Sequence, residues 1–246
     1  MFSSEGGRGW SLSLYAGAGE AGGSWQSGSS SGGARPGPGE AADPDRSASE
    51  AARRARGQLR RYCTANRLNR FGTLTYEGEG VHDPRLLRVH VGEFFRSLRA
   101  SLGGKAFPYV WVPEWHHTDH GLHVHFAVGR YIARRHLLQA WGRGHVHIKL
   151  IGDLPVGSGV HAEARRAAGY LSKYVGKGFD EVTEPGLHRY EGAQGFQPER
   201  TRLWGRMLDD VVAQAVDVMG SAPGYVWQSQ VADGWMGPPA VWLSWN

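Results

Sequence analysis

The stretch GLHVHFAVG, residues 121–129, sets His123 and His125 one residue apart in an apolar run. Successive residues of a β-strand point to opposite faces, so both imidazoles share one face and the apolar side chains around them occupy the other. An aromatic-rich stretch, YVWVPEW at 109–115, comes shortly before, and the turn-forming residues HHTDHG separate the two. Together they predict a β-hairpin whose second strand presents two histidines to the same side.

The register of this hairpin predicts a third polar group beside the histidines. If residues 118 and 119 form the tip, Glu114 lies opposite His123 and Val112 lies opposite His125, and cross-strand Cβ atoms are about 5 Å apart. Two imidazoles and one carboxylate would then share a face and leave coordination positions open. The sequence therefore predicts His123, His125 and Glu114 as a candidate site for a divalent cation.

Other histidines leave alternatives open. The chain has 12 of them, and a second pair with the same spacing occurs at His145 and His147. Pairs with this spacing also occur on strands that bind no metal. Three further histidines belong to the turn of the hairpin, where solvated polar side chains are expected: His116, His117 and His120.

A second group of candidate residues lies in AGYLSKYVGK, residues 168–177. Residues four apart share a helix face, so Tyr170 and Tyr174 form one pair and Lys173 and Lys177 another. Only four of the 28 Lys and Arg residues are lysines, and two of them fall here. This favours compact ammonium groups beside two phenols, although an amphipathic helix that buries its tyrosines in the core is an alternative.

Composition limits the class of protein. The chain of 246 residues is 40% hydrophobic and has a formal net charge of +5, which is compatible with a polyanionic partner. Its single cysteine, Cys63, excludes an intramolecular disulfide and a cysteine-rich zinc site. No apolar run is long enough to span a membrane, and no signal peptide is evident. We therefore expect a cytoplasmic protein.

The pattern of apolar residues predicts an α+β fold, with a mostly antiparallel sheet and flanking helices. Residues 1–46 are rich in Gly and Ser and are predicted to be disordered. Residues 47–220 are predicted to form the domain, and residues 221–246 are a Trp-rich tail without an assigned role. In order, the expected elements are a helix over 47–68, a strand over 70–76, a helix opened by Asp83 and Pro84, the hairpin, a helix over 133–141, a strand over 145–151, a helix over 161–177 and a helix over 203–218.

Three motifs in order resemble those of the HUH endonucleases: FGTLTY at 71–76, GLHVHFAVG at 121–129 and YLSKYVGK at 170–177. The doubled Y-x-x-K is most similar to the two-tyrosine rolling-circle replication initiators of bacterial plasmids and single-stranded DNA phages. The resemblance covers about residues 70–178 and implies a ferredoxin- or RRM-like sheet, with the histidine strand central and the tyrosine helix beside it. No G-x-x-x-x-G-K-[ST] motif is present, so no fused helicase is expected.

The resemblance also implies a mechanism. His123 and His125 would be metal ligands, with Glu114 as the third, and the ion would be Mn²⁺ or Mg²⁺. Tyr170, the favoured first nucleophile, or Tyr174 would attack the DNA, form a 5′-phosphotyrosine link and free a 3′-hydroxyl. A second transfer would later rejoin the strands. Two lysines would stabilise the phenolate and the transferring phosphate, namely Lys173 and Lys177.

The implied partners are single-stranded or hairpin origin DNA, and a helicase and a polymerase of a bacterial host. Thr73 and Thr75 would line the site, while Arg53 and Arg60 lie on a basic helix face that would contact phosphates or stay solvated. Competing functions are an HUH transposase or relaxase, another metalloenzyme with a facial triad of ligands, and a non-catalytic RRM-like nucleic-acid-binding module. The binding module explains the charge but not the spacing of tyrosines and lysines.

Overall fold

The computed structural model describes residues 8–28, 43–151, 160–177 and 190–245, except for the side chains of Pro44, Val160 and residues 174–177. The chain divides into two compact units. Unit 1 is built from both ends of the chain, residues 1–48 and 198–246, and unit 2 comprises residues 49–197.

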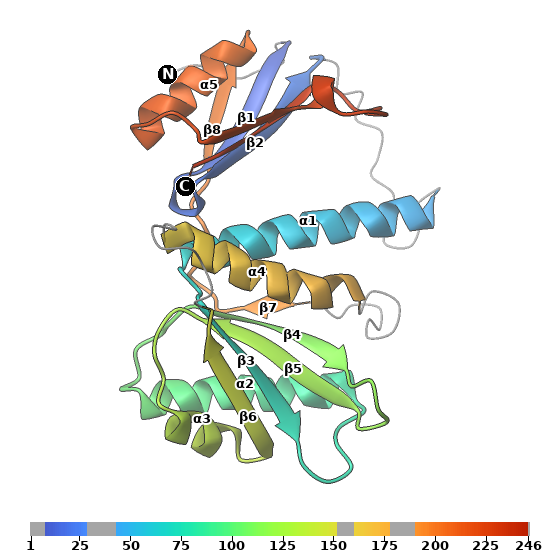
Figure 1. Cartoon of the computed structure of the whole chain (residues 1–246), viewed down its shortest axis with the longest axis vertical. Helices are drawn as coiled ribbons and strands as arrows, with labels where there is room; N and C mark the ends of the chain where they lie inside the picture. Colours follow the sequence, from blue (N-terminus) through green and yellow to red (C-terminus); the bar gives the residue numbers. More distant parts are fainter. Residues whose placement is uncertain (1–7, 29–42, 152–159, 178–189, 246) are drawn as a thin grey trace. The chain divides into compact units, whose positions relative to one another are not determined.

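Unit 2 is built on a five-stranded sheet in the order β6-β3-β5-β4-β7 (Figure 1). Each neighbouring pair is antiparallel. The predicted α+β fold with a mostly antiparallel sheet is confirmed, and the histidine strand β5 is its central strand. The strands are β3 (Arg70–Tyr76), β4 (Tyr109–Trp115), β5 (Leu122–Val128), β6 (Gly144–Leu150) and β7 (Glu191–Gly192).

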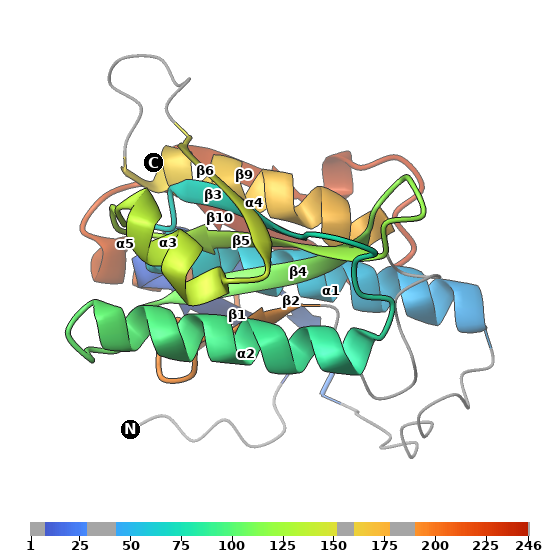
Figure 2. The same ribbon diagram turned by 90° about the horizontal axis from the view of Figure 1, so that it is seen from below.

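Helices cover both faces of this sheet (Figures 1 and 2). On one face, α2 (Pro84–Ser101) and α3 (Arg134–Trp141) share an apolar core with Val124 and Phe126 of β5. On the other face, α1 (Pro44–Ala65) and α4 (Val160–Lys177) form a second core around Leu59 and Leu171. Because side chains alternate along β5, its histidines point to the face that α1 and α4 cover. None of the described helices combines the length and the apolar character that crossing a membrane requires.

The start of α2 agrees with its sequence pattern. The carboxylate of Asp83 accepts a hydrogen bond from the backbone N–H of Arg85 at 2.8 Å, and Pro84 is the first residue of the helix, where its missing N–H leaves no bond unmade. The apolar stripe of this helix is buried at Leu87, Val91, Phe94, Phe95 and Leu98.

The start of α1 differs from its prediction. The sequence predicts Ser47 as the N-cap, but α1 begins at Pro44, and the carboxylate of Asp43 accepts a hydrogen bond from the backbone N–H of Arg46 at 2.9 Å. An Asp-Pro pair therefore opens this helix as it opens α2, and it outweighs the capping-box pattern that lies one turn further on.

Unit 1 contains a second five-stranded antiparallel sheet, in the order β8-β1-β2-β10-β9. Helix α5 (Leu208–Met219) packs against β8 and β1, and its Val211 and Ala215 share a core with Leu12 and Leu14. The strands are β1 (Gly9–Tyr15), β2 (Glu20–Gln26), β8 (Thr201–Gly205), β9 (Tyr225–Gln228) and β10 (Ala240–Ser244), with short 3₁₀ turns at Ala16–Ala18 and Ser229–Val231.

This second sheet corrects three expectations. Strands β1 and β2 lie within residues 1–46, for which the sequence predicts disorder. Strands β9 and β10 lie within the Trp-rich tail, residues 221–246. The helix expected over 203–218 is instead β8 followed by α5, so the predicted domain boundary at 220 falls inside unit 1.

Glycine explains why β2 resembles a flexible linker in the sequence. Its sequence, EAGGSWQ, has two glycines in a row. A Cβ on Gly23 would collide with the backbone of Ser11 and Leu12 on β1, and a Cβ on Gly22 would lie 3.3 Å from the ring of Trp242 on β10. These glycines therefore serve close packing between strands rather than flexibility.

Candidate metal centre and tyrosine helix

The hairpin has the register that the sequence predicts. Glu114 on β4 pairs with His123 on β5, and Val112 pairs with His125. Alternation along both strands then places the carboxylate and both imidazoles on one face of the sheet.

The three side chains converge closely. Glu114 Oε2 lies 2.8 Å from His123 Nε2 and 2.7 Å from His125 Nε2. The candidate ligand atoms of this triad all lie within 4.8 Å of one another, and no other such group occurs among the described residues. His125 is buried, while Glu114 and His123 are half-buried. Two nitrogens and one oxygen aimed at a common point can hold a metal ion and leave its other positions open to a substrate.

The protonation of the triad suits metal binding. Burial opposes the charge on Glu114, but hydrogen bonds from His123 and His125 outweigh it and lower the pKa of the carboxyl to about 2. Burial also lowers the pKa of His125, although the hydrogen bond to Glu114 opposes this. At neutral pH the expected state is an ionised carboxylate beside a neutral imidazole at position 125, which is the form that ligates cations.

Thr73 orients the buried histidine. Thr73 on β3 pairs with His125 on β5, and its Oγ1 lies 3.1 Å from His125 Nδ1. A hydroxyl can both donate and accept. When it accepts from Nδ1–H, the lone pair of Nε2 is free to face the cation, as the partner of a metal-ligating histidine usually ensures. Thr75 lies on the same face of β3, and the backbone there pairs with His145.

We expect Thr73→Val to weaken Mn²⁺ binding about tenfold to a hundredfold, because loss of such an orienting partner typically has this effect. Valine keeps the shape of threonine and removes only the hydroxyl. Isothermal titration with Mn²⁺ measures the change. Thr75→Val is the matched control and should leave the affinity within about twofold; an equal loss in both variants would contradict the orienting role.

The tyrosine helix packs on the same face as the triad. Ala167, Ala168 and Leu171 of α4 belong to the core that also contains Val112 and Ala127 of the hairpin. The half-buried Tyr170 therefore approaches the sheet from the side on which the triad lies.

A single phenylalanine connects Tyr170 to the triad. The ring of Phe71 stacks on that of His125, with centroids 5.3 Å apart and planes 20° apart. The same Phe71 ring lies 6.0 Å from the ring of Tyr170. Tyr170 and His125 are thus separated by one aromatic ring, which fixes the position of the helix relative to the sheet.

Two ammonium groups lie against the Tyr170 ring. Lys173 Nζ is 5.1 Å from its centroid and Lys149 Nζ is 5.4 Å from it. Lys149 is on β6, where it pairs with Phe71 on β3. The sequence motifs point to Lys173 but not to Lys149. The available signal is that Lys149 is another of only four lysines in an arginine-rich chain.

A comparison with protein-family models finds one match in this part of the chain. The model for the replication-associated protein ORF2 matches residues 69–179. This range runs from the residue before β3 to just beyond α4, and it includes the triad, Lys149 and Tyr170. Residues 69–179 are an ORF2 replication domain. No significant similarity to a curated protein or to a solved structure was found.

The ORF2 domain brings together most of the predicted site residues that the structure describes. His123, His125, Glu114, Thr73 and Thr75 share one face of the sheet, and Tyr170 and Lys173 reach that face from α4. The helix extends through Tyr174 and Lys177, but these two side chains lie outside the described part of the structure. Arg53 is exposed and Arg60 is half-buried on α1, so DNA contact through either arginine stays a prediction.

Further histidines of the ORF2 domain surround the triad. The ring of His116 lies 5.2 Å from that of His123, and His120 Nε2 is 2.8 Å from the carbonyl oxygen of Tyr76. Both are half-buried, whereas the sequence predicts solvated turn residues. The second histidine pair, His145 and His147, is exposed on β6, with His147 paired to Thr73.

Proposed function

We propose that the chain is a replication initiator that nicks single-stranded origin DNA by attack of a tyrosine. The observation that carries the proposal is the approach of Tyr170 to the His123–His125–Glu114 face through the ring of Phe71. The family match to a replication-associated protein supports the same conclusion.

In this proposal the chain's residues divide the work of one phosphoryl transfer. The phenol of Tyr170 or Tyr174 loses its proton, its oxygen bonds to phosphorus, and the bond from phosphorus to the 3′-oxygen breaks. The products are a 5′-phosphotyrosine and a free 3′-hydroxyl, a polarity that rests on the resemblance to HUH initiators. A second tyrosine one turn away allows a further transfer while the first strand remains attached.

A divalent cation held by the triad would neutralise charge on a non-bridging phosphate oxygen and orient the phosphorus for attack. We propose Mn²⁺ or Mg²⁺, because two imidazoles and a carboxylate with open positions accept substrate phosphate oxygens as further ligands. The three protein ligands need little adjustment, since Glu114 already lies within hydrogen-bonding distance of both imidazoles.

Lysines provide positive charge near the attacking oxygen. A free phenol ionises near pH 10, so attack at neutral pH needs a nearby positive charge that favours the oxyanion. Lys173 and Lys149 lie against the Tyr170 ring. We infer that Lys149 belongs to the nicking site although it lies outside the tyrosine motif.

Replacing Lys149 with methionine should reduce the nicking rate about tenfold or more, since one of two charges beside the nucleophile is lost. Lys149→Arg should restore most of the rate. The measurement is single-turnover cleavage of a labelled oligonucleotide, with DNA affinity measured separately by anisotropy. Lys105→Met is the control, because it removes an exposed lysine outside the site. A loss of affinity that accounts for the whole effect would show that Lys149 only binds DNA.

The deciding experiment for the function is incubation of the full chain with single-stranded DNA and Mn²⁺, followed by mass spectrometry. A tyrosine-linked nucleotide on the peptide that contains Tyr170 and Tyr174 is expected. Nicking of a hairpin origin, rather than of transposon ends or a transfer origin, would favour initiation over transposition and conjugation. With no helicase motif in the sequence, unwinding and extension are assigned to a separate helicase and a polymerase of the host.

A further inference from the structure

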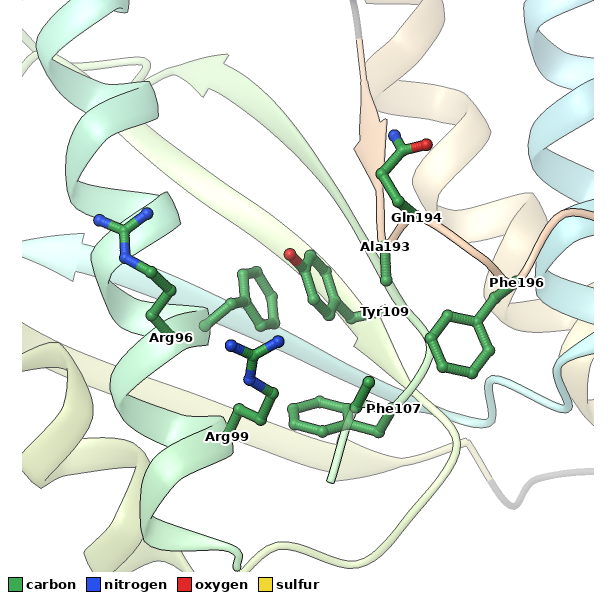
Figure 3. A pocket seen from close by; sticks show the side chains of 9 residues that line it. Arg96, Arg99, Phe107, Tyr109, Ala193, Gln194 and Phe196 are labelled. Carbon is green, nitrogen blue, oxygen red and sulfur yellow. The ribbon is translucent and has the colours of Figure 1, made fainter. Parts of the chain in front are cut away.

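A cavity of about 250 Å³ lies on unit 2 at the end of β4 away from Glu114. In Figure 3, Arg96 and Arg99 project from α2 on one side, Gln194 and Phe196 lie on the other, and Phe107 and Tyr109 stand between them. Phe95, Ala106 and Ala193 complete the lining.

The cavity is separate from the metal centre. Tyr109 belongs to the face of the sheet that packs on α2, whereas Glu114 points to the face covered by α1 and α4. The two residues are also five positions apart, or about 17 Å along the strand. No lining residue belongs to the triad or to α4, so an occupant of this cavity would not compete with DNA at the nicking site.

The walls of the cavity are held in place. The backbone N–H of Ala193 donates to the carbonyl of Tyr109 at 2.9 Å, and the hydroxyl of Tyr62 donates to the carbonyl of Ala193 at 3.1 Å. The side-chain amide of Asn66 donates to the carbonyl of Phe196 at 2.9 Å. A site whose walls are already ordered loses little conformational entropy when a ligand binds.

The charge in the cavity is positive and lacks an acidic counterpart. Arg96 and Arg99 are exposed one helical turn apart, and within the described residues neither has an ion-pair partner. A third guanidinium, from Arg130, lies 5.9 Å from the centroid of the Phe107 ring. No Asp or Glu occurs among the described lining residues, and the nearby Glu191 pairs with Arg88.

Aromatic rings form the rest of the surface. Tyr109 stacks face to face on Phe95, with centroids 3.5 Å apart, and Phe107 meets Tyr109 edge-on at 6.0 Å. Phe107 is buried and Phe196 half-buried. The cavity therefore offers flat apolar walls together with guanidinium forks and the amide of Gln194.

We propose that this cavity binds one nucleotide unit, with the base against the aromatic wall and the phosphate on Arg96 and Arg99. Guanidinium forks match the geometry of phosphate oxygens, and aromatic rings stack on bases of any sequence. The volume is below the usual range for drug-sized ligands, which limits the occupant to a single unit. The same chemistry is found in a free nucleotide and in one nucleotide of a DNA strand.

The test uses the full chain, in EDTA, and a fluorescent etheno-adenosine monophosphate followed by anisotropy. The double variant Arg96→Gln, Arg99→Gln should weaken binding at least about tenfold, because two charge-assisted hydrogen bonds are lost. Ala106→Trp, which fills the cavity from an exposed position, should weaken it similarly. The control is Arg134→Gln, Arg135→Gln, which removes two exposed arginines from α3 and should stay within about twofold.

Competition separates the two sources of the ligand. Displacement of the label by a short single strand at lower concentration than dAMP assigns the cavity to a DNA strand, and the reverse order assigns it to free nucleotides. Three results would overturn the proposal: no binding by the unaltered protein, equal displacement by inorganic phosphate, or equal loss in the control variant. The variant Tyr170→Phe, Tyr174→Phe must keep nucleotide binding, so failure of the nicking function and failure of the cavity proposal are distinguishable.

Discussion

Covalent attachment to single-stranded DNA should disappear when Tyr170 and Tyr174 are both replaced by phenylalanine. The phenylalanine ring preserves the packing of Tyr170 against Phe71, which lie 6.0 Å apart, and removes only the oxygen that bonds to phosphorus. We expect the SDS-stable adduct to fall on the order of a thousandfold or more, as removal of a nucleophile does in other covalent enzymes. Denaturing electrophoresis with a labelled oligonucleotide measures the adduct.

The single variants show which tyrosine attacks first. Tyr170→Phe alone should remove most of the first transfer if Tyr170 is the first nucleophile, and Tyr174→Phe alone should then affect mainly the second transfer. Tyr131→Phe is the matched control, because Tyr131 is an exposed tyrosine, 74% accessible, outside the tyrosine helix. An adduct that persists in the double variant would show that another residue is the nucleophile.

Replacing His123 with alanine should reduce Mn²⁺ affinity and nicking together. The triad has only three protein ligands, and loss of one also removes a hydrogen bond that helps to keep Glu114 ionised. We expect a loss of about a hundredfold in metal affinity, at the upper end of what loss of an orienting neighbour alone produces. Isothermal titration and single-turnover cleavage measure the two effects in the same preparation.

The second histidine pair provides the control for this experiment. His147→Ala removes an exposed imidazole from the same face of the same sheet, on β6, where it pairs with Thr73. This variant should bind Mn²⁺ and cleave DNA within about twofold of the unaltered protein. Undiminished cleavage in EDTA would remove the metal from the mechanism, whatever the result for His123.

The sequence predicts the centre of unit 2 well because the evidence is local. Alternation over residues 122–128 and a short turn are enough to predict the hairpin and the pairing of Glu114 with His123. The Asp-Pro pair and the apolar spacing predict α2 in the same way. Each of these elements is specified by residues within about 20 positions of one another, so no knowledge of distant pairing is needed.

The remaining features depend on contacts between distant parts of the chain. Lys149 reaches Tyr170 only because β6 pairs with β3, and the sequence contains no local sign of that pairing. Unit 1 is harder still, since β1 and β2 pair with strands that begin at Thr201 and Ala240. A Gly-rich strand such as β2 resembles a linker until the neighbour that requires its glycines is known.

The composition of unit 1 has a consequence for synthesis on the ribosome. Strand β2 lies between β1 and β10, so this sheet is incomplete until the last strand has left the exit tunnel. At roughly 5–20 residues per second, the β1–β2 hairpin waits about ten to forty seconds for β10. During that interval one long edge of β2 has no neighbour, which is the condition under which nascent chains pair with one another. Slow elongation or crowded polysomes should therefore affect the yield of the protein through unit 1, while the strands of the ORF2 domain find their partners earlier.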